Sequence, residues 1–117
     1  MGILDDLREK LHIDDREYCE VKKIVGRIEE TLNSKDIYFD EQIRVGFYSH
    51  MVSFIRRLKK NELVTDVDEK AVLDQIDKEN LDLAIKLIKP LFDKFKVEYS
   101  YSEIVLIAIY IQTANKN

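Results

Sequence analysis

The chain has 117 residues, of which 45% are hydrophobic and 36% are charged. This length suits one domain with a single core. The balance, with only three Gly and one Pro, is typical of a helix-rich folded domain rather than of a disordered chain. The formal net charge of −4 disfavours direct binding of DNA or RNA, because such binding needs a positive surface that displaces phosphate counterions.

Cysteine and histidine usage argues against a metal site. Cys19 is the only cysteine, which excludes an intramolecular disulfide and fits a reducing compartment, and we expect it to be a small apolar side chain on a helix. His12 and His50 lie far apart without a HExxH or cysteine motif, and we expect His12 to be a surface residue in a linker. We therefore predict no metal and no cofactor.

Two further classes of protein are disfavoured. Acidic residues within "MGILDDLREK" and the lack of a long apolar run argue against a signal peptide and a membrane span, so we predict a cytoplasmic location. No nucleophile with an adjacent base and no pair of carboxylates in an apolar setting stands out, which argues against an enzyme.

The sequence of the N-terminal half predicts three helical segments. Apolar residues at helical spacing make residues 1–16 a short amphipathic lead-in, followed by a helical domain over residues 17–117. Asp14 and Asp15 can cap a second helix that runs to Leu32. This helix has one apolar face, formed by Tyr18, Val21, Val25, Ile28 and Leu32.

Asp40 can cap the third helix, which follows the break at "NSKD". Its apolar face is formed by Ile43, Phe47, His50, Met51, Phe54 and Leu58. The helix ends in the basic run "RRLKK", where cations complement the carbonyl end of the helix dipole.

The stretch "NELVTDVDEK" interrupts the pattern and offers Thr65 and Asp66 as caps. From Ala71 to Phe95 the sequence again has helical periodicity, with a break expected near residues 78–80. Pro90 lies inside this pattern and should either kink the helix or divide it in two. We favour a kink.

The last segment, "SYSEIVLIAIYIQTANKN", is ambiguous because its central run is continuously apolar and β-branched, as in a buried strand. Ser100 followed by Glu103 fits a capping box, and no second strand is available for pairing, so a buried helix is favoured. The prediction is an all-α fold, a compact bundle of about five helices, with the central and last helices most buried.

His50 admits two interpretations. It shares a helix face with Phe47 and Phe54, where a neutral imidazole at the edge of a core is the ordinary explanation. Alternatively, imidazole is a good nucleophile at neutral pH and can accept a phosphoryl group. Arg57, two turns further along the same face, could neutralise the added charge by charge-assisted hydrogen bonds.

From Glu17 to Ala114 the sequence resembles the PTS regulation domain, or PRD, a helical module of bacterial antiterminators and activators controlled by the sugar phosphotransferase system. The resemblance is carried by "IYFDEQIRVGFYSHMVSFIRRL", "ENLDLAIKLIKPLFDKFKVEYSYSE" and "YSEIVLIAIYIQTA". By order and spacing, His50 matches the family's phosphorylatable histidine and Arg57 its partner arginine.

The chain also departs from the family pattern. Tyr110 stands at the position of the family's second histidine; its hydroxyl could hydrogen-bond to His50 but is no ordinary substitute as a phosphoacceptor. Ser49 stands where some members have an acidic residue. Only about sixteen residues precede the match, too few for the nucleic-acid-binding domain that usually comes before the module, so we expect a stand-alone PRD.

The resemblance implies a non-enzymatic, dimeric regulator of sugar-utilisation genes. The histidine phosphocarrier protein or an enzyme IIB component would phosphorylate it and thereby change its dimer packing. The alternative is an adaptor that keeps the PRD fold as a dimerisation module and is not phosphorylated.

Overall fold

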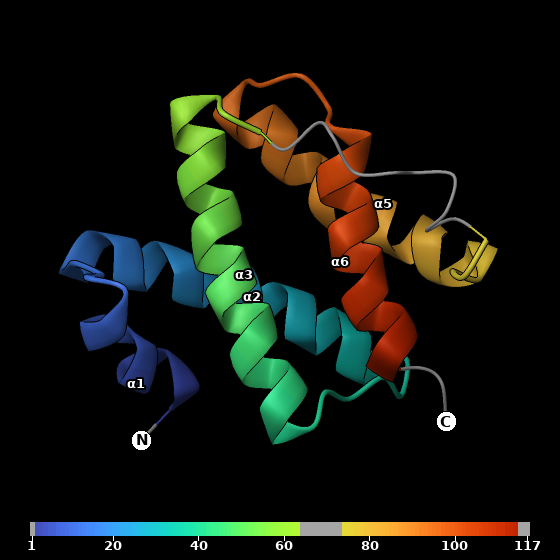
Figure 1. The fold of residues 1–117 in the computed structure, drawn as a ribbon, viewed down its shortest axis with the longest axis horizontal. Coiled ribbons are helices and arrows are strands. Elements are labelled where there is room, and N and C mark those ends of the chain that lie inside the picture. Colours follow the sequence, from blue (N-terminus) through green and yellow to red (C-terminus); the bar gives the residue numbers. More distant parts are fainter. Residues whose placement is uncertain (1, 64–73, 115–117) are drawn as a thin grey trace. The chain divides into compact units, whose positions relative to one another are not determined.

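The computed structural model describes residues 2–63 and 74–114, and all of the regular structure in these ranges is helical. The helices are α1 (Ile3–Lys10), α2 (Asp15–Ser34), α3 (Glu41–Lys60), α5 (Lys78–Phe95) and α6 (Tyr101–Ala114) (Figure 1). The predicted all-α fold is confirmed. The expected caps Thr65 and Asp66, and the expected helix start at Ala71, lie outside the described residues.

The chain divides into two compact units, Met1–Ile55 and Arg56–Asn117. The first unit contains α1, α2 and most of α3. The second unit contains the last residues of α3, together with α5 and α6. The proposed division into a lead-in of residues 1–16 and a domain of residues 17–117 stays a prediction.

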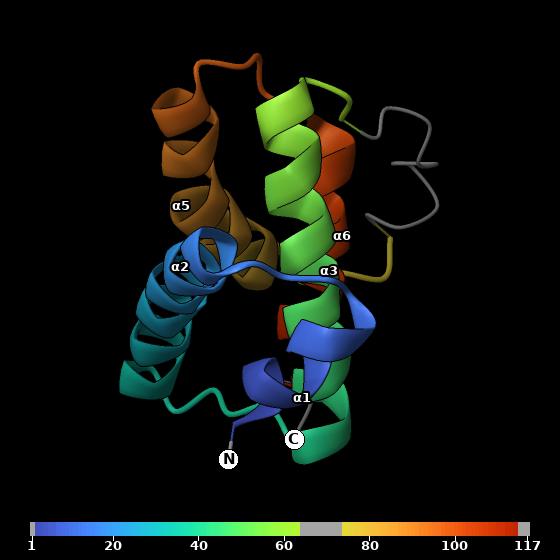
Figure 2. The same cartoon turned by 90° about the vertical axis from the view of Figure 1, so that its left-hand side faces the viewer.

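In the first unit, α2 begins where the sequence predicted. The Asp14 carboxylate accepts a hydrogen bond from the backbone N–H of Glu17 at 2.8 Å, satisfying one of the unpaired donors at the helix start. Four members of the expected apolar stripe, Val21, Val25, Ile28 and Leu32, are at most 4% exposed. The fifth, Tyr18, is only partly buried, and Ile24, which was not part of the predicted stripe, is buried instead. The short helix α1 contacts α2 (Figure 2), and the Tyr18 hydroxyl donates to Asp5 on α1 at 2.7 Å.

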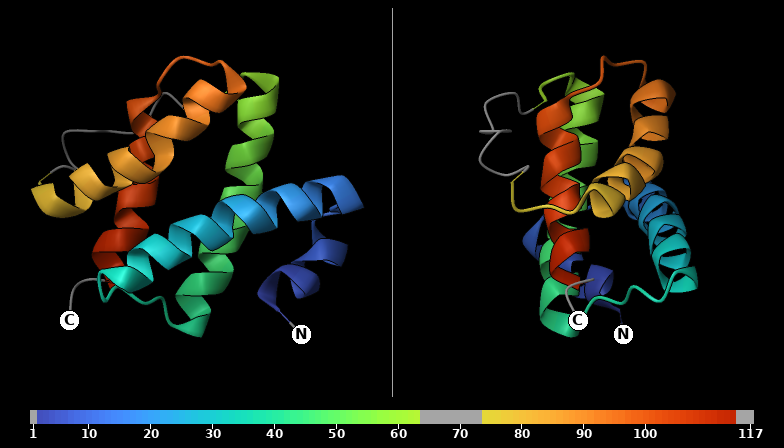
Figure 3. Two further views of the ribbon diagram at one scale, coloured as in Figure 1. Left: turned by 180° about the vertical axis from the view of Figure 1, so that it is seen from behind. Right: turned by 90° about the vertical axis from the view of Figure 1, so that its right-hand side faces the viewer.

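In the second unit, α5 is one helix that passes through Pro90 (Figure 3). The break expected near residues 78–80 coincides with the beginning of α5 at Lys78. Pro90 is exposed, so its ring faces the surface rather than the packed side of α5. The buried side comprises Ala84, Ile88, Leu91 and Phe92. The two-piece alternative for residues 81–95 is therefore wrong.

The last segment is the helix α6 and not a strand, as predicted. It packs against α5 and buries Ile104, Val105, Ile107, Ala108 and Ile111. Near its C-terminal end, the Gln112 side-chain oxygen accepts hydrogen bonds from the backbone N–H of Asp77, at 3.0 Å, and from the side-chain amide of the buried Asn80. Gln112 thus satisfies the backbone N–H of Asp77 at the start of α5, where the Asp77 side chain makes no capping hydrogen bond.

The turn between α5 and α6 places the start of α6. Lys96 ends α5 in the left-handed conformation, with φ 57°, and the Val97 N–H donates to the Phe92 carbonyl at 3.0 Å. Tyr99 then packs edge-on against Phe92, with ring centroids 5.6 Å apart, and donates its hydroxyl hydrogen bond to Asp93 at 2.8 Å. These contacts fix the backbone immediately before Ser100.

Candidate functional site

His50 lies on α3, in the first unit. The Asp40 carboxylate caps this helix by accepting the N–H of Ile43 at 2.8 Å, as the sequence predicted. Phe47, Met51 and Phe54 are fully buried, whereas His50 is partly exposed. The imidazole therefore sits at the edge of the buried stripe of α3.

Arg57 lies on the same helix, seven residues after His50, in the second unit. Its Nε and Nη2 atoms each donate a 2.7 Å hydrogen bond to one carboxylate oxygen of Glu103 on α6. The Glu103 side chain is 0% exposed, and the Arg57 side chain is 24% exposed. Parallel N–H···O bonds of this kind are among the strongest side-chain contacts.

Glu103 is a functional candidate that our sequence analysis missed. We assigned it only to a capping box, and the observed cap is the Ser100 hydroxyl, which accepts the Glu103 N–H at 3.4 Å. The carboxylate binds Arg57 instead. The signal was present in the sequence, since a glutamate that leads directly into "IVLIAIYI" enters the most apolar run of the chain and needs a cationic partner if it is buried.

Tyr110 lies on α6 in the second unit, seven residues after Glu103 and on the same face of the helix. The residue is partly buried, and this burial raises the pKa of its hydroxyl. At neutral pH Tyr110 therefore carries a protonated hydroxyl, which can donate and accept hydrogen bonds.

A second polar cluster, also missed by our sequence analysis, lies in the first unit. Arg44 on α3 donates from Nε to Glu29 Oε2 on α2 at 2.7 Å, and from Nη2 to Glu29 Oε1 at 3.1 Å. The Tyr48 hydroxyl donates to the same carboxylate and accepts from Arg44 at 3.0 Å. Burial, followed by the bond to Glu29, raises the pKa of Tyr48 to about 12. The cluster joins α2 to α3 within this unit.

Replacing Tyr48 by phenylalanine should flatten the alkaline dependence of stability. A folded-state pKa raised above the unfolded value favours folding below about pH 10, and this contribution is lost as the pH rises toward 12. At neutral pH the substitution should cost about 1 kcal/mol, the worth of one hydrogen bond. Urea denaturation between pH 7 and pH 12 measures both effects. The matched control is Tyr38→Phe, because the Tyr38 side chain is 61% exposed; an equal change of slope in this control contradicts the assignment.

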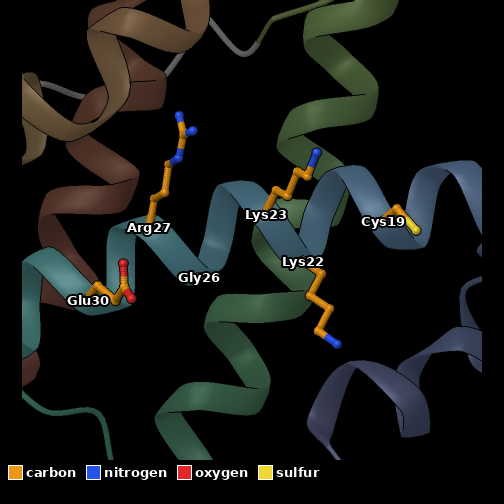
Figure 4. A pocket seen from close by; sticks show the side chains of 6 residues that line it. All are labelled: Cys19, Lys22, Lys23, Gly26, Arg27 and Glu30. Atoms are coloured by element: carbon orange, nitrogen blue, oxygen red, sulfur yellow. The ribbon is translucent and has the colours of Figure 1, made fainter.

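Two surface pockets lie in the first unit. One, of about 250 Å³, is lined by Glu29, Asn33, Tyr38, Phe39 and Arg44. The other is a shallow groove of about 460 Å³ formed by residues of α2 alone (Figure 4). Within residues 2–63 and 74–114, His, Cys, Asp and Glu side chains form no group of three that could hold a metal ion. Cys19 lies on α2 as predicted, but its side chain is exposed.

The comparisons with known proteins give one match. A family model described as the PRD domain matches residues 22–114. This range includes His50, Arg57, Glu103 and Tyr110. No curated protein and no solved structure matches the chain.

Proposed function

Because the chain belongs to the PRD family of PTS regulation domains, we propose that it is a regulatory module of phosphotransferase-linked transcriptional control of sugar utilisation, switched by phosphorylation of His50. The observation that carries the proposal is the family match, which extends over 22–114 and so includes helices of both units. PRD modules are regulatory rather than enzymatic. The proposed phosphoryl donors are the histidine phosphocarrier protein or an enzyme IIB component.

The setting of His50 supports its role as the phosphoacceptor. His50 is partly exposed as a residue, although its Nε2 atom is buried, and its neighbours Phe47, Met51 and Phe54 are buried as well. A phosphoryl group there adds about −1.5 to −2 charges beside apolar side chains. Such a change is tolerated only with a cationic partner or a change in packing, which is how a single modification can favour one of two dimer arrangements.

Arg57 is the proposed electrostatic partner of the phosphorylated histidine. The two residues are seven positions apart on one continuous helix, a spacing that places them on the same face. Because Arg57 already binds Glu103 through two hydrogen bonds, a phosphate would have to compete with this carboxylate. We propose that this competition transmits phosphorylation of His50 to α6.

The alternative function is an adaptor that keeps the PRD fold for dimerisation and is not phosphorylated. Two observations favour it. Arg57 is already neutralised by Glu103, and residue 110, which by the resemblance corresponds to the family's second histidine, is a tyrosine. In this case His50 is a structural residue at the edge of the core, and regulation depends only on which protein binds the dimer.

Incubation with the phosphocarrier system and phosphoenolpyruvate distinguishes the two functions. Regulation by phosphorylation predicts the addition of about one phosphate per chain, detected by intact-mass spectrometry, and the loss of this label in His50→Ala. Since His12 is exposed on the short turn after α1, His12→Ala is the control and should be labelled like the wild type. An unlabelled wild type, or equal labelling of His50→Ala, favours the adaptor.

The proposed site of action is the cytoplasm, where the soluble phosphocarrier proteins of this system operate. None of the helices in the described ranges has both the length and the apolar character for crossing a bilayer. The proposed active form is a homodimer without direct contact to nucleic acid. Analytical ultracentrifugation with and without phosphorylation measures this assembly.

A further inference from the structure

The groove on α2 is a surface without a role in the function proposed above. It is lined by Cys19, Lys22, Lys23, Gly26, Arg27 and Glu30. Figure 4 shows the side chain of Lys22 pointing to one side of the helix and those of Lys23 and Arg27 pointing to the other. These residues lie opposite the buried stripe of α2, so the groove faces solvent.

Gly26 is the first unusual feature of this groove. A glycine inside a helix lowers its stability relative to alanine, and Gly26 stands in the middle of the 20-residue helix α2. A Cβ atom added at this position would have no atom within 4 Å. No packing within the described chain therefore requires a glycine here. A small residue is required only if another backbone approaches α2 closely from outside.

The charge around Gly26 is the second feature. The chain as a whole carries a formal charge of −4, yet three of the six residues that line the groove are cations and only Glu30 is acidic. Lys23 and Arg27 are exposed, and they form no ion pair or side-chain hydrogen bond with the described residues. Arg44 and Arg57, in contrast, both bind carboxylates.

We propose that this groove is the docking surface for an acidic helix of a partner protein, which crosses α2 at Gly26. The missing Cβ allows close approach of the two helices, and helix axes at a contact with small side chains lie near the short end of the usual 8–10 Å range. Carboxylates on both flanks of the partner helix pair with Lys22 on one side and with Lys23 and Arg27 on the other. Glu30 in the groove and the acidic net charge make a protein a better occupant than a nucleic acid.

A designed probe tests this surface with the full-length chain. The probe is a fluorescent, 21-residue helical peptide with glutamates on both sides of an alanine stripe, and the control peptide has glutamine at the same positions. Fluorescence anisotropy should show binding of the glutamate peptide alone, weakened as salt rises because exposed charges are screened. Binding of both peptides with equal affinity, or of neither, overturns the proposal.

Two variants locate the contact. Gly26→Ala should raise the melting temperature by about 4 °C, because alanine favours the helix, and should still weaken peptide binding about tenfold. Such opposite effects cannot result from misfolding. Lys23→Glu/Arg27→Glu should abolish binding, whereas Lys78→Glu/Lys86→Glu, an equal charge change at exposed positions of α5, should not. Unchanged affinity in Gly26→Ala overturns the crossing at this residue.

Two other occupants give different results. Tighter binding of a single-stranded DNA or RNA oligonucleotide with the same number of negative charges would identify a nucleic-acid surface and overturn the proposal. The proposal would also be overturned if the acidic peptide does not bind and sedimentation shows that both groove variants lose self-association. The occupant of the groove would then be a second copy of this chain. His50 labelling is independent of all these outcomes, because the variants leave α3 unchanged.

Discussion

Arg57→Ala should lower the free energy of unfolding by about 4 kcal/mol, because it removes the two charge-assisted hydrogen bonds that Arg57 donates to a buried carboxylate. The Glu103 side chain is 0% exposed and both of its oxygens bind Arg57. Glu103→Ala should cost less, about 2 kcal/mol, because the Arg57 side chain is 24% exposed and can turn toward water. Urea denaturation of the three proteins measures this asymmetry.

The double variant Arg57→Met/Glu103→Leu separates the net contribution of the ion pair to the free energy of unfolding from the cost of removing only one of its partners. Replacing a buried ion pair by apolar side chains of similar volume is often neutral or stabilising, so the double variant should unfold within about 1 kcal/mol of the wild type. The matched control is Arg27→Ala, which removes an exposed arginine that forms no ion pair with the described residues and should change stability by less than about 0.5 kcal/mol. An equal cost of Arg57→Ala and Arg27→Ala would show that the Arg57–Glu103 pair contributes nothing.

The helices of this protein were predictable because each signal for them is local. The caps at Asp14 and Asp40 involve residues three positions apart, and the apolar stripe of α2 repeats every three to four residues. The alternative of two pieces at Pro90 failed for a related reason. A proline removes one backbone hydrogen bond inside a helix, and because Pro90 lies on the exposed face of α5, the carbonyl that loses its donor can be hydrated while the helix continues.

The site was predictable only in part, because its partners are far apart in the sequence. Position and spacing singled out His50 and Arg57, but Glu103 lies 46 residues after Arg57, and no local pattern connects the two. Asn80 and Gln112 are 32 residues apart, and Glu29 and Arg44 are 15 apart. Charged and amide side chains at a core edge find their partners through packing, so a single sequence shows which of them need a partner without showing which partner they have.

Phosphorylation of His50 should lower the melting temperature of the wild type by about 5 °C or more and should not lower that of Glu103→Gln. In the wild type, a phosphate that recruits Arg57 removes both Arg57 hydrogen bonds from the buried Glu103 carboxylate, which destabilises the second unit. In Glu103→Gln no buried charge is left behind, so Arg57 can bind the phosphate without this penalty and the melting temperature should stay constant or rise. Differential scanning fluorimetry of each protein before and after labelling gives the two shifts.

The comparison of the two shifts is a double-mutant cycle in which phosphorylation is one of the two changes. His50→Ala, treated in the same way, should show no shift in either background, which removes effects of the phosphocarrier proteins themselves. An equal fall in the wild type and in Glu103→Gln would mean that the phosphate acts without Arg57. If the wild type is labelled and this outcome is observed, His50 is still the phosphoacceptor, but the Arg57–Glu103 pair has only a structural role. The signal would then have to reach α6 by repacking of the apolar face of α3.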